Sequence, residues 1–163
     1  MLSRLIFVAC GLVFTCNLSA QTCNPDIQAS TPDARFTHNG DGTVTDQQTG
    51  LIWKRCLEGQ SGADCMTGTP ESFTWQQALQ RGASQSPWRL PNIKELASIV
   101  ELHCYDPAIN LTMFPNDPGG YVWSGSPYAA HANLAWYVDF DSGHASGYYR
   151  GYSRHVRLVR DGQ

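Results

Sequence analysis

The most constraining feature of this sequence is a helix start within residues 88–96. Leu90 precedes a proline, which disfavours helical geometry and predicts an extended residue there. Asn92 can accept a hydrogen bond from a free backbone N–H of a helix, and Glu95 can bond back to the Asn92 N–H. The apolar residues that follow recur at helical spacing: Ile93, Leu96, Ala97 and Val100. The sequence therefore predicts a short extended segment that leads into a buried helix from residue 93 to about residue 103.

Residues 1–20 have the pattern of a secretory signal peptide. Arg4 precedes an apolar run over residues 5–14, and small and polar residues follow up to Ala20. Because the run is about half of the ~20 residues that span a bilayer, cleavage after Ala20 is favoured over a retained membrane anchor. We expect a secreted or periplasmic bacterial protein after Sec-type cleavage, with no membrane insertion after signal cleavage.

Charge is unevenly distributed along the chain. The formal net charge of −3 argues against general nucleic-acid binding. Residues 142–160, however, contain no acidic residue and four arginines: Arg150, Arg154, Arg157 and Arg160. These arginines are either solvated side chains on a strand and its loop, or they form a local anion-binding face.

Four cysteines follow the signal segment, which suggests two disulfides in an oxidising compartment. Four cysteines allow three pairings. Cys56 and Cys65 flank a Gly- and Ser-containing loop and would close it locally, and Cys23 and Cys104 would then join the N-terminal arm to the end of the second helix. A zinc site is the alternative, but no pair has the CxxC spacing that such sites favour.

The rest of the chain predicts one α+β domain. Residues 21–34, rich in Pro, Asp, Ser and Thr, form an extended N-terminal arm, and residues 35–163 form the domain. Turn residues and period-two patterns predict strands at residues 43–45, 51–55, 121–124, 135–140 and 154–159, with a short strand possible at 146–149. A first helix is expected after Thr74, and residues 105–120, with three prolines, are expected to be irregular. Two helices would thus pack with short antiparallel strands and long loops.

An ordered set of motifs covers residues 35–160. It comprises Arg35-Phe36 and residues 39–46 (NGDGTVTD), 49–56 (TGLIWKRC), 74–79 (TWQQAL), 88–96 (WRLPNIKEL), 107–109 (PAI), 114–115 (FP), 123–128 (WSGSPY), 135–140 (AWYVDF) and 156–160 (VRLVR). In this order they resemble the DUF1566, or Lcl C-terminal domain, family. The resemblance implies a fold similar to C-type lectins and formylglycine-generating enzymes. It also implies binding of sulfated polysaccharides, as for the family's collagen-like adhesin, although this chain lacks collagen-like Gly-X-Y repeats.

Patterns of catalysis are weak in this chain. The related formylglycine-generating enzymes use paired cysteines, whereas the cysteines here are better explained as structural. No Gly-x-Ser-x-Gly elbow or HExxH motif occurs. Asp139 and Asp141 could form an acid–base pair, but a turn at a strand end or ordinary solvated charge is the favoured interpretation. We therefore expect no catalytic residues, no cofactor and no metal centre.

Calcium is the one metal for which the sequence offers candidate ligands. Asn39, Asp41 and Asp46 could supply oxygens to a weak site. An EF-hand is excluded, because aligning Gly42 with the loop glycine puts Thr37 and Gln48 where Asp and Glu are required. The lectin-type triplets Glu-Pro-Asn and Gln-Pro-Asp are absent, so these residues are expected to form a turn.

The best candidate for a ligand surface is the loop-like segment 141–155. Its tyrosines offer flat apolar area with a hydroxyl at low entropic cost, and its arginines offer forked donors for sulfate or carboxylate. The predicted ligand-binding residues are Tyr148, Tyr149, Arg150, Tyr152, Arg154 and His144. The expected function is a secreted, non-enzymatic module that binds a polysaccharide or another surface ligand. The alternatives are a protein-interaction or phage-type display domain and an enzyme of the formylglycine-generating type.

Overall fold

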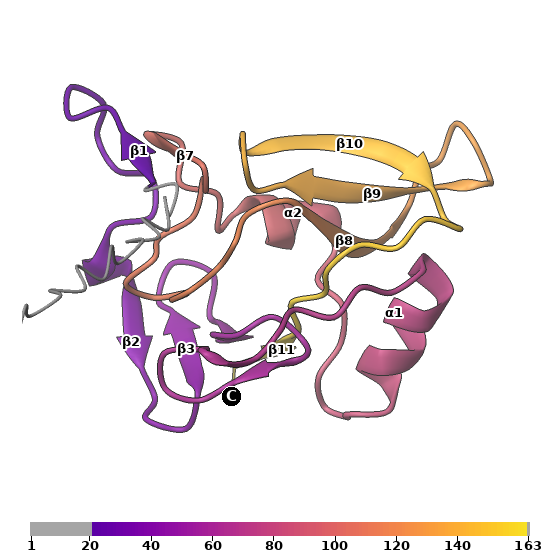
Figure 1. Ribbon diagram of the computed structural model, residues 1–163, viewed down its shortest axis with the longest axis horizontal. Helices are drawn as coiled ribbons and strands as arrows, with labels where there is room; N and C mark the ends of the chain where they lie inside the picture. The colour runs from indigo at the N-terminus through magenta and orange to yellow at the C-terminus, as the bar shows by residue number, and fades with distance from the viewer. Residues whose placement is uncertain (1–20, 163) are drawn as a thin grey trace, which may run out of the picture.

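The strands predicted at residues 43–45 and 51–55 pair as the first hairpin, at the centre of a four-stranded antiparallel sheet in the computed structural model, which describes residues 21–162. Its strands lie in the order β11 (Val159–Asp161), β4 (Leu51–Lys54), β3 (Thr43–Asp46) and β2 (Phe36–His38). The last strand of the chain thus pairs with the first hairpin, with Val159 opposite Trp53 (Figure 1). The signal peptide expected at residues 1–20 lies outside the described residues.

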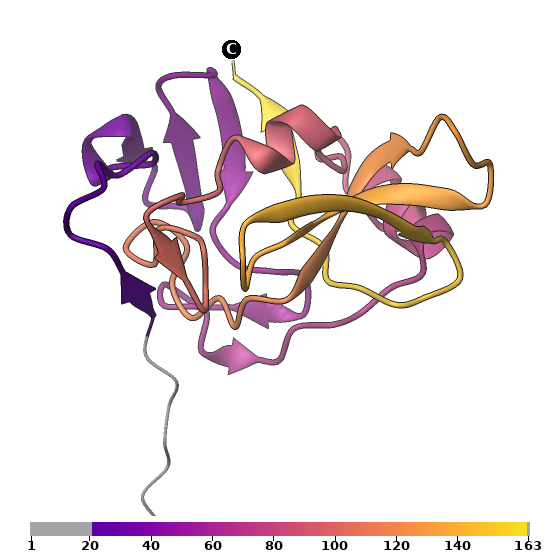
Figure 2. The ribbon, with the colours of Figure 1, turned by 90° about the horizontal axis from the view of Figure 1, so that it is seen from above.

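A second, three-stranded antiparallel sheet follows the irregular segment. It is formed by β8 (Tyr121–Pro127), β9 (Leu134–Asp139) and β10 (His144–Tyr149), with β9 in the centre. Two small ribbons complete the strands: β1 (Thr22–Cys23) with β7 (Cys104–Tyr105), and β5 (Gln60–Ser61) with β6 (Thr67–Gly68). The three-stranded sheet extends away from β1 in both views, so its far end is remote from the N-terminal arm (Figures 1 and 2).

Both helices begin where local capping predicts. At α1 (Trp75–Ala83) the capping box is formed by Thr74 and Gln77, and at α2 (Ile93–Ala97) it is formed by Asn92 and Glu95. Each box satisfies backbone donors that a helix start leaves without partners. The two helices and the mostly antiparallel strands confirm the α+β class.

The length predicted for the second helix is wrong. It ends at Ala97 rather than near residue 103. The N–H groups of Ile99 and Val100 donate to carbonyls three residues back, and the donors after them bond to other parts of the chain. The N–H of Glu101 donates to the carbonyl of Ala108, and the N–H of Leu102 donates to Ser30 Oγ. The apolar spacing still has a role, since Leu96 and Val100 are both buried.

The core consists of two clusters of buried side chains, and both include residues of β8 and β9. The larger cluster lies between the four-stranded sheet, α2 and β8–β9, and its largest members are Trp53, Phe114 and Phe140. The smaller cluster joins α1 to β8 and the C-terminal segment: Ala78, Leu90, Trp123, Ala135, Val156 and Leu158. The segment predicted as a strand at 154–159 makes only isolated bridges before β11 begins at Val159.

The N-terminal arm is docked against the body. The Cys23–Cys104 disulfide joins β1 to β7, and the side chain of Gln21 donates to the carbonyls of Pro107 and Ile109. Further along, a short 3-10 helix (Asp33–Arg35) leads into β2. None of the helices in residues 21–162 has the length and apolar character required to cross a membrane.

Candidate binding site

Three exposed tyrosines gather at the C-terminal end of β10 and in the turn that follows. The exposed fractions of Tyr148, Tyr149 and Tyr152 are 38%, 54% and 58%. The Tyr148 ring centroid lies 5.9 Å from that of Tyr149 and 5.0 Å from that of Tyr152, and both pairs meet edge to face. Edge-to-face contacts stabilise aromatic pairs beyond their buried area, so the three rings support one another as a tyrosine cluster.

A shallow cleft of about 570 Å³ lies within this cluster. Its lining consists of Asn133, Tyr149, Arg150, Gly151 and Tyr152. Three of the six ligand-binding residues predicted from sequence therefore line one cavity, and Tyr148 supports them from β10. A mostly apolar hollow with a few polar groups is the usual form of a small-ligand site, and its volume falls in the ordinary range.

Arg150 is positioned by contacts on both sides of its guanidinium group. Its Nε donates to the carbonyl of Leu134 at 3.0 Å, and its Cζ lies 4.2 Å from the centroid of the Trp75 ring. Trp75 is the first residue of α1, and its own N–H donates to the carbonyl of Arg150. Helix α1 thus holds Arg150 at the edge of the cleft, and no carboxylate of residues 21–162 pairs with it.

Arg154 does not lie on the surface as the sequence interpretation required. It is only 7% exposed, and its guanidinium carbon lies 4.0 Å from the ring centroid of Tyr137 and 4.4 Å from that of Tyr121. The rings of Tyr148 and Trp123 complete the enclosure. Burial lowers the pKa of Arg154, although the neighbouring tyrosines partly oppose this. The assignment of Arg154 as an exposed anion ligand is therefore wrong, and this residue supports the aromatic side chains instead.

The remaining arginines of residues 142–160 do not form an anion-binding face either. Arg157 is fully buried, and its guanidinium contacts the carboxylate of Asp117 at 2.5 Å and the carbonyls of Lys54 and Arg55. Arg160 lies over the ring of Trp88. The proposed arginine face and the alternative of four solvated arginines are both incorrect, because Arg154 and Arg157 are buried and only Arg150 lines the cleft.

Comparison with known proteins adds one finding. The family model described as the Lcl C-terminal domain matches residues 42–160, which is most of the chain. The chain belongs to the Lcl C-terminal domain family. No curated protein and no solved structure matches it. The matched range begins one residue before β3 and includes the whole tyrosine cluster, whereas the N-terminal arm precedes it.

His144 lies apart from the cleft in this Lcl C-terminal domain. It opens β10 opposite Asp139, whereas Tyr148 and Tyr149 close the same strand. Sequence reasoning also missed Tyr121 on β8 and Tyr137 on β9, whose rings enclose the guanidinium group of Arg154. The period-two pattern placed Tyr137 on the face opposite Trp136 and Val138, but no pattern indicated that an arginine would cross that face.

The oxygens considered for calcium take part in two separate sets of contacts. Asp46 is buried, pairs with Arg35 at 2.5 Å and accepts from Thr49 Oγ1 at 2.7 Å. Asp41 lies before the other end of β3 and accepts from the N–H and Oγ1 of Thr43. Burial raises the pKa of Asp46, but the bonds from Arg35 and Thr49 outweigh it and lower the pKa. These contacts account for both carboxylates as supports of the first hairpin.

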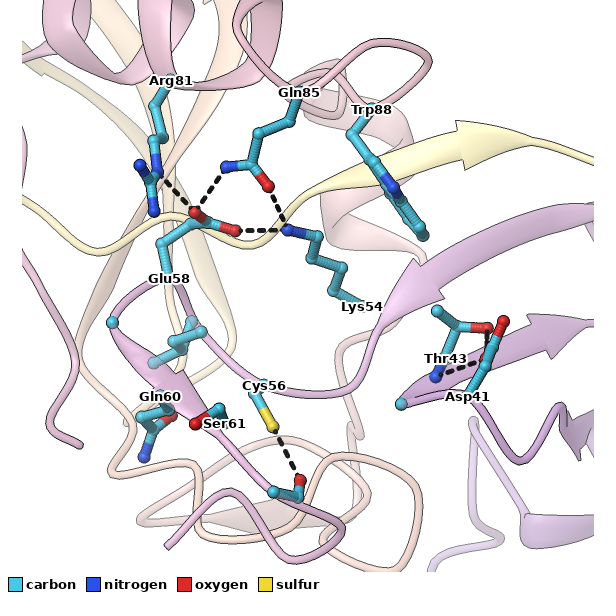
Figure 3. A pocket seen from close by; sticks show the side chains of 14 residues that line it. Asp41, Thr43, Lys54, Cys56, Glu58, Gln60, Ser61, Arg81, Gln85 and Trp88 are labelled. Carbon is cyan, nitrogen blue, oxygen red and sulfur yellow. Dashed lines mark hydrogen bonds and ion pairs between the residues drawn. The ribbon is translucent and has the colours of Figure 1, made fainter. Parts of the chain in front are cut away.

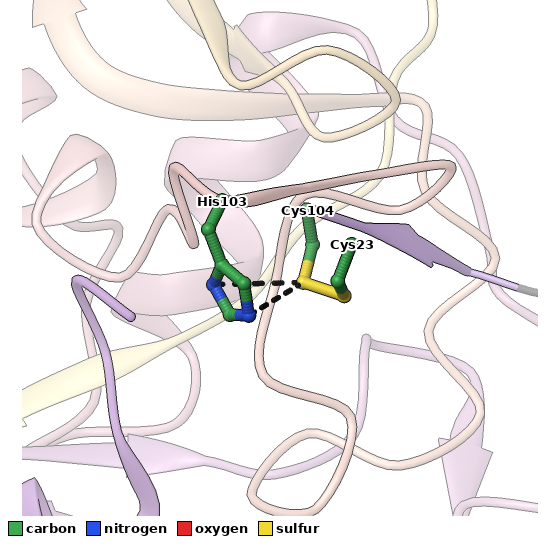
Figure 4. Close-up of side chains that lie close together, drawn as sticks. All are labelled: Cys23, His103 and Cys104. Carbon is green, nitrogen blue, oxygen red and sulfur yellow. Dashed lines mark hydrogen bonds between the residues drawn. A yellow bond between two sulfur atoms is a disulfide. The ribbon is translucent and has the colours of Figure 1, made fainter. Parts of the chain in front are cut away.

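The four cysteines are paired as the sequence predicted, Cys23 with Cys104 and Cys56 with Cys65. His103 lies beside the first disulfide, with its Nε2 3.5 Å from Cys104 Sγ (Figure 4). Cys23, His103 and Cys104 are close enough together to resemble a metal site. Their sulfurs are bonded to each other, however, and a thiolate is what a metal requires from cysteine. In this state the group is a structural link between the arm and β7.

Proposed function

We propose that this domain is a secreted or periplasmic, non-enzymatic module that binds polysaccharide through the tyrosine cluster. The observation that supports this best is the cleft lined by Tyr149, Arg150 and Tyr152, with the ring of Tyr148 in edge-to-face contact with both tyrosines. Exposed tyrosines offer flat apolar area to a sugar ring and hydroxyls to its polar edge. Membership of the Lcl C-terminal domain family supports an adhesin-associated role, and the α+β architecture with long loops is compatible with a C-type-lectin-like fold.

The position of Arg150 refines the expected ligand. Only one arginine lines the cleft, so stacking on tyrosine would supply most of the affinity and charge a smaller part. Exposed charge contacts are screened by salt, whereas aromatic stacking is not. Retention on an acidic polysaccharide such as heparin is therefore expected to fall with salt without disappearing.

A glycan and polyanion screen with paired variants tests this function. Tyr149→Ala with Tyr152→Ala should weaken retention at least tenfold, which corresponds to about 1.4 kcal/mol. Tyr105→Ala is the matched control, because Tyr105 is 53% exposed but lies on β7 near the N-terminal arm. Equal retention of the double variant and the control would contradict the proposal. Arg150→Gln should reduce only the salt-sensitive part of retention.

The second candidate function is recognition of a protein, because tyrosine-rich loops also serve as protein-binding surfaces. A screen without glycan hits, together with a protein partner whose binding is lost in the tyrosine double variant, would select it. An enzyme of the formylglycine-generating type would need two reduced cysteines, whereas Cys23, Cys56, Cys65 and Cys104 are all in disulfides. Two free thiols in the mature protein, detected by mass spectrometry, would revive that alternative.

A further inference from the structure

A larger hollow, of about 670 Å³, lies away from the tyrosine cluster and shares no lining residue with its cleft. Its walls come from the end of β4, the loop closed by the Cys56–Cys65 disulfide, and the segment that includes α1 and Trp88. Figure 3 shows the polar side chains that face it. The lining includes the side chains of Lys54, Glu58, Gln60, Arg81, Gln85 and Trp88.

Glu58 organises one wall of this hollow. It is only 4% exposed, and its Oε1 accepts from Lys54 Nζ at 2.9 Å. Its Oε2 accepts from Arg81 Nε at 2.6 Å and from Gln85 Nε2 at 2.8 Å (Figure 3). Burial raises the pKa of Glu58, but these three bonds outweigh it and lower the pKa. Glu58 is therefore a carboxylate that fixes two cations side by side.

The wall retains more donors than Glu58 can use. Lys54 Nζ makes two hydrogen bonds, to Glu58 and Gln85, and an ammonium group has three protons. Arg81 uses only its Nε, and within residues 21–162 its terminal nitrogens bond to no other group. Across the loop, the buried Oε1 of Gln60 accepts no hydrogen bond in the described chain. Lys54 and Arg81 thus face a single carboxylate on this wall and keep unused donors, whereas the second carboxylate of the lining, Asp41, lies on the side away from Arg81 (Figure 3).

We propose that this hollow binds a small monoanion that carries a carboxylate, of about the size of a hexuronic acid. The terminal nitrogens of Arg81, unpaired within residues 21–162, match the two oxygens of a carboxylate, and Lys54 supplies a further donor on the same wall. A dianion is disfavoured, because Glu58 lies beneath and Asp41 lies on the side away from Arg81 (Figure 3). The volume suits a sugar-sized molecule, and Trp88 adds apolar area to the lining.

Titration of the ¹⁵N-labelled mature domain with D-glucuronate tests the proposal by NMR. D-glucose is the neutral control, because it replaces the carboxylate with a hydroxymethyl group, and inorganic phosphate at pH 8 is the dianion control. Glucuronate should shift the Trp88 indole and Arg81 Nε resonances in a saturable way and bind at least tenfold more tightly than glucose or phosphate. Equal binding of glucose and glucuronate, or tighter binding of phosphate, would overturn the proposal.

Variants distinguish this pocket from the tyrosine cleft. Arg81→Gln should weaken glucuronate binding at least tenfold, and Arg81→Lys, which retains the charge but not the fork, should weaken it less. Arg150→Gln and Tyr149→Ala should leave it unchanged, since neither residue lines the pocket. Unchanged glucuronate binding in both Arg81 variants would refute the pocket while leaving the polysaccharide proposal intact. Unchanged polysaccharide retention in the tyrosine double variant would refute the polysaccharide proposal while leaving the pocket intact.

Discussion

The carboxylate of Glu101 binds Ser30 and Thr31 of the N-terminal arm, and we predict that Glu101→Gln weakens this attachment and destabilises the fold. Its Oε1 accepts from the N–H and Oγ of Ser30 at 2.8 and 2.9 Å. Its Oε2 accepts from the N–H and Oγ1 of Thr31 at 2.8 and 2.7 Å, and His103 Nδ1 lies 2.7 Å from Oε1. Glutamine keeps the shape of the side chain but presents an NH₂ group to one of the two backbone N–H donors. One buried donor would then lose its acceptor.

The size of the effect follows from the pKa of Glu101. Burial raises this pKa, but the hydrogen bonds from His103, Thr31 and Ser30 outweigh it and lower the pKa from 4.5 to about 2. At about 1.36 kcal/mol per pKa unit, the ionised carboxylate stabilises the fold by roughly 3 kcal/mol. Because the folded pKa is depressed, this contribution is complete above pH 4.5 and is lost as the pH falls through 2.

Urea unfolding at pH 7 and pH 2, with disulfides intact and tryptophan fluorescence as the signal, measures the effect. Glu101→Gln should lower the free energy of unfolding by about 2–3 kcal/mol at pH 7 and by less than about 1 kcal/mol at pH 2. Glu71→Gln is the control, because Glu71 is exposed and accepts no side-chain hydrogen bond in the described chain. A change below about 0.5 kcal/mol at pH 7, or an equal change at both pH values, would refute the reasoning.

Three further predictions concern the buried supports of the fold. Asp117→Ala should lower the free energy of unfolding, measured in urea titrations, by about 3–5 kcal/mol, because it leaves the buried Arg157 without its carboxylate. The double variant Asp117→Leu with Arg157→Met should recover part of this loss. Removing the Cys23–Cys104 disulfide, which spans 81 residues, should cost about 4.5 kcal/mol, against about 2.6 kcal/mol for the Cys56–Cys65 link of 9 residues. A larger loss for the shorter link would contradict the chain-entropy argument. Thr74→Ala should cost about 1 kcal/mol through loss of the α1 cap, with Gln76→Ala, an exposed position of the same helix, as the control.

The sequence predicted those parts of the fold that depend on neighbouring residues. Both capping boxes form because their partners are three residues apart, as with Asn92 and Glu95. The hairpin of β3 and β4 follows from turn residues between two short apolar runs. The same local reasoning placed three exposed tyrosines in one segment, and the structure brings two of them to one cleft.

Features that depend on distant residues could not be predicted in this way. The second helix does not continue to residue 103, because Ala108 and Ser30 take the backbone donors of Glu101 and Leu102. Arg157 is buried because Asp117, forty positions away, neutralises it. Arg154 is enclosed by rings from β8, β9 and β10, so its charge pattern in the sequence gave no indication of its burial.

The central claim is that the tyrosine cluster meets the ligand, and chemical-shift mapping tests it most directly. The probe is an oligosaccharide fragment of the glycan that the mature domain retains most strongly in the screen. The account predicts that the largest shifts fall on Asn133, Tyr149, Arg150, Gly151 and Tyr152, which line the cleft. Saturable shifts elsewhere, with the resonances of these residues unmoved, would contradict it.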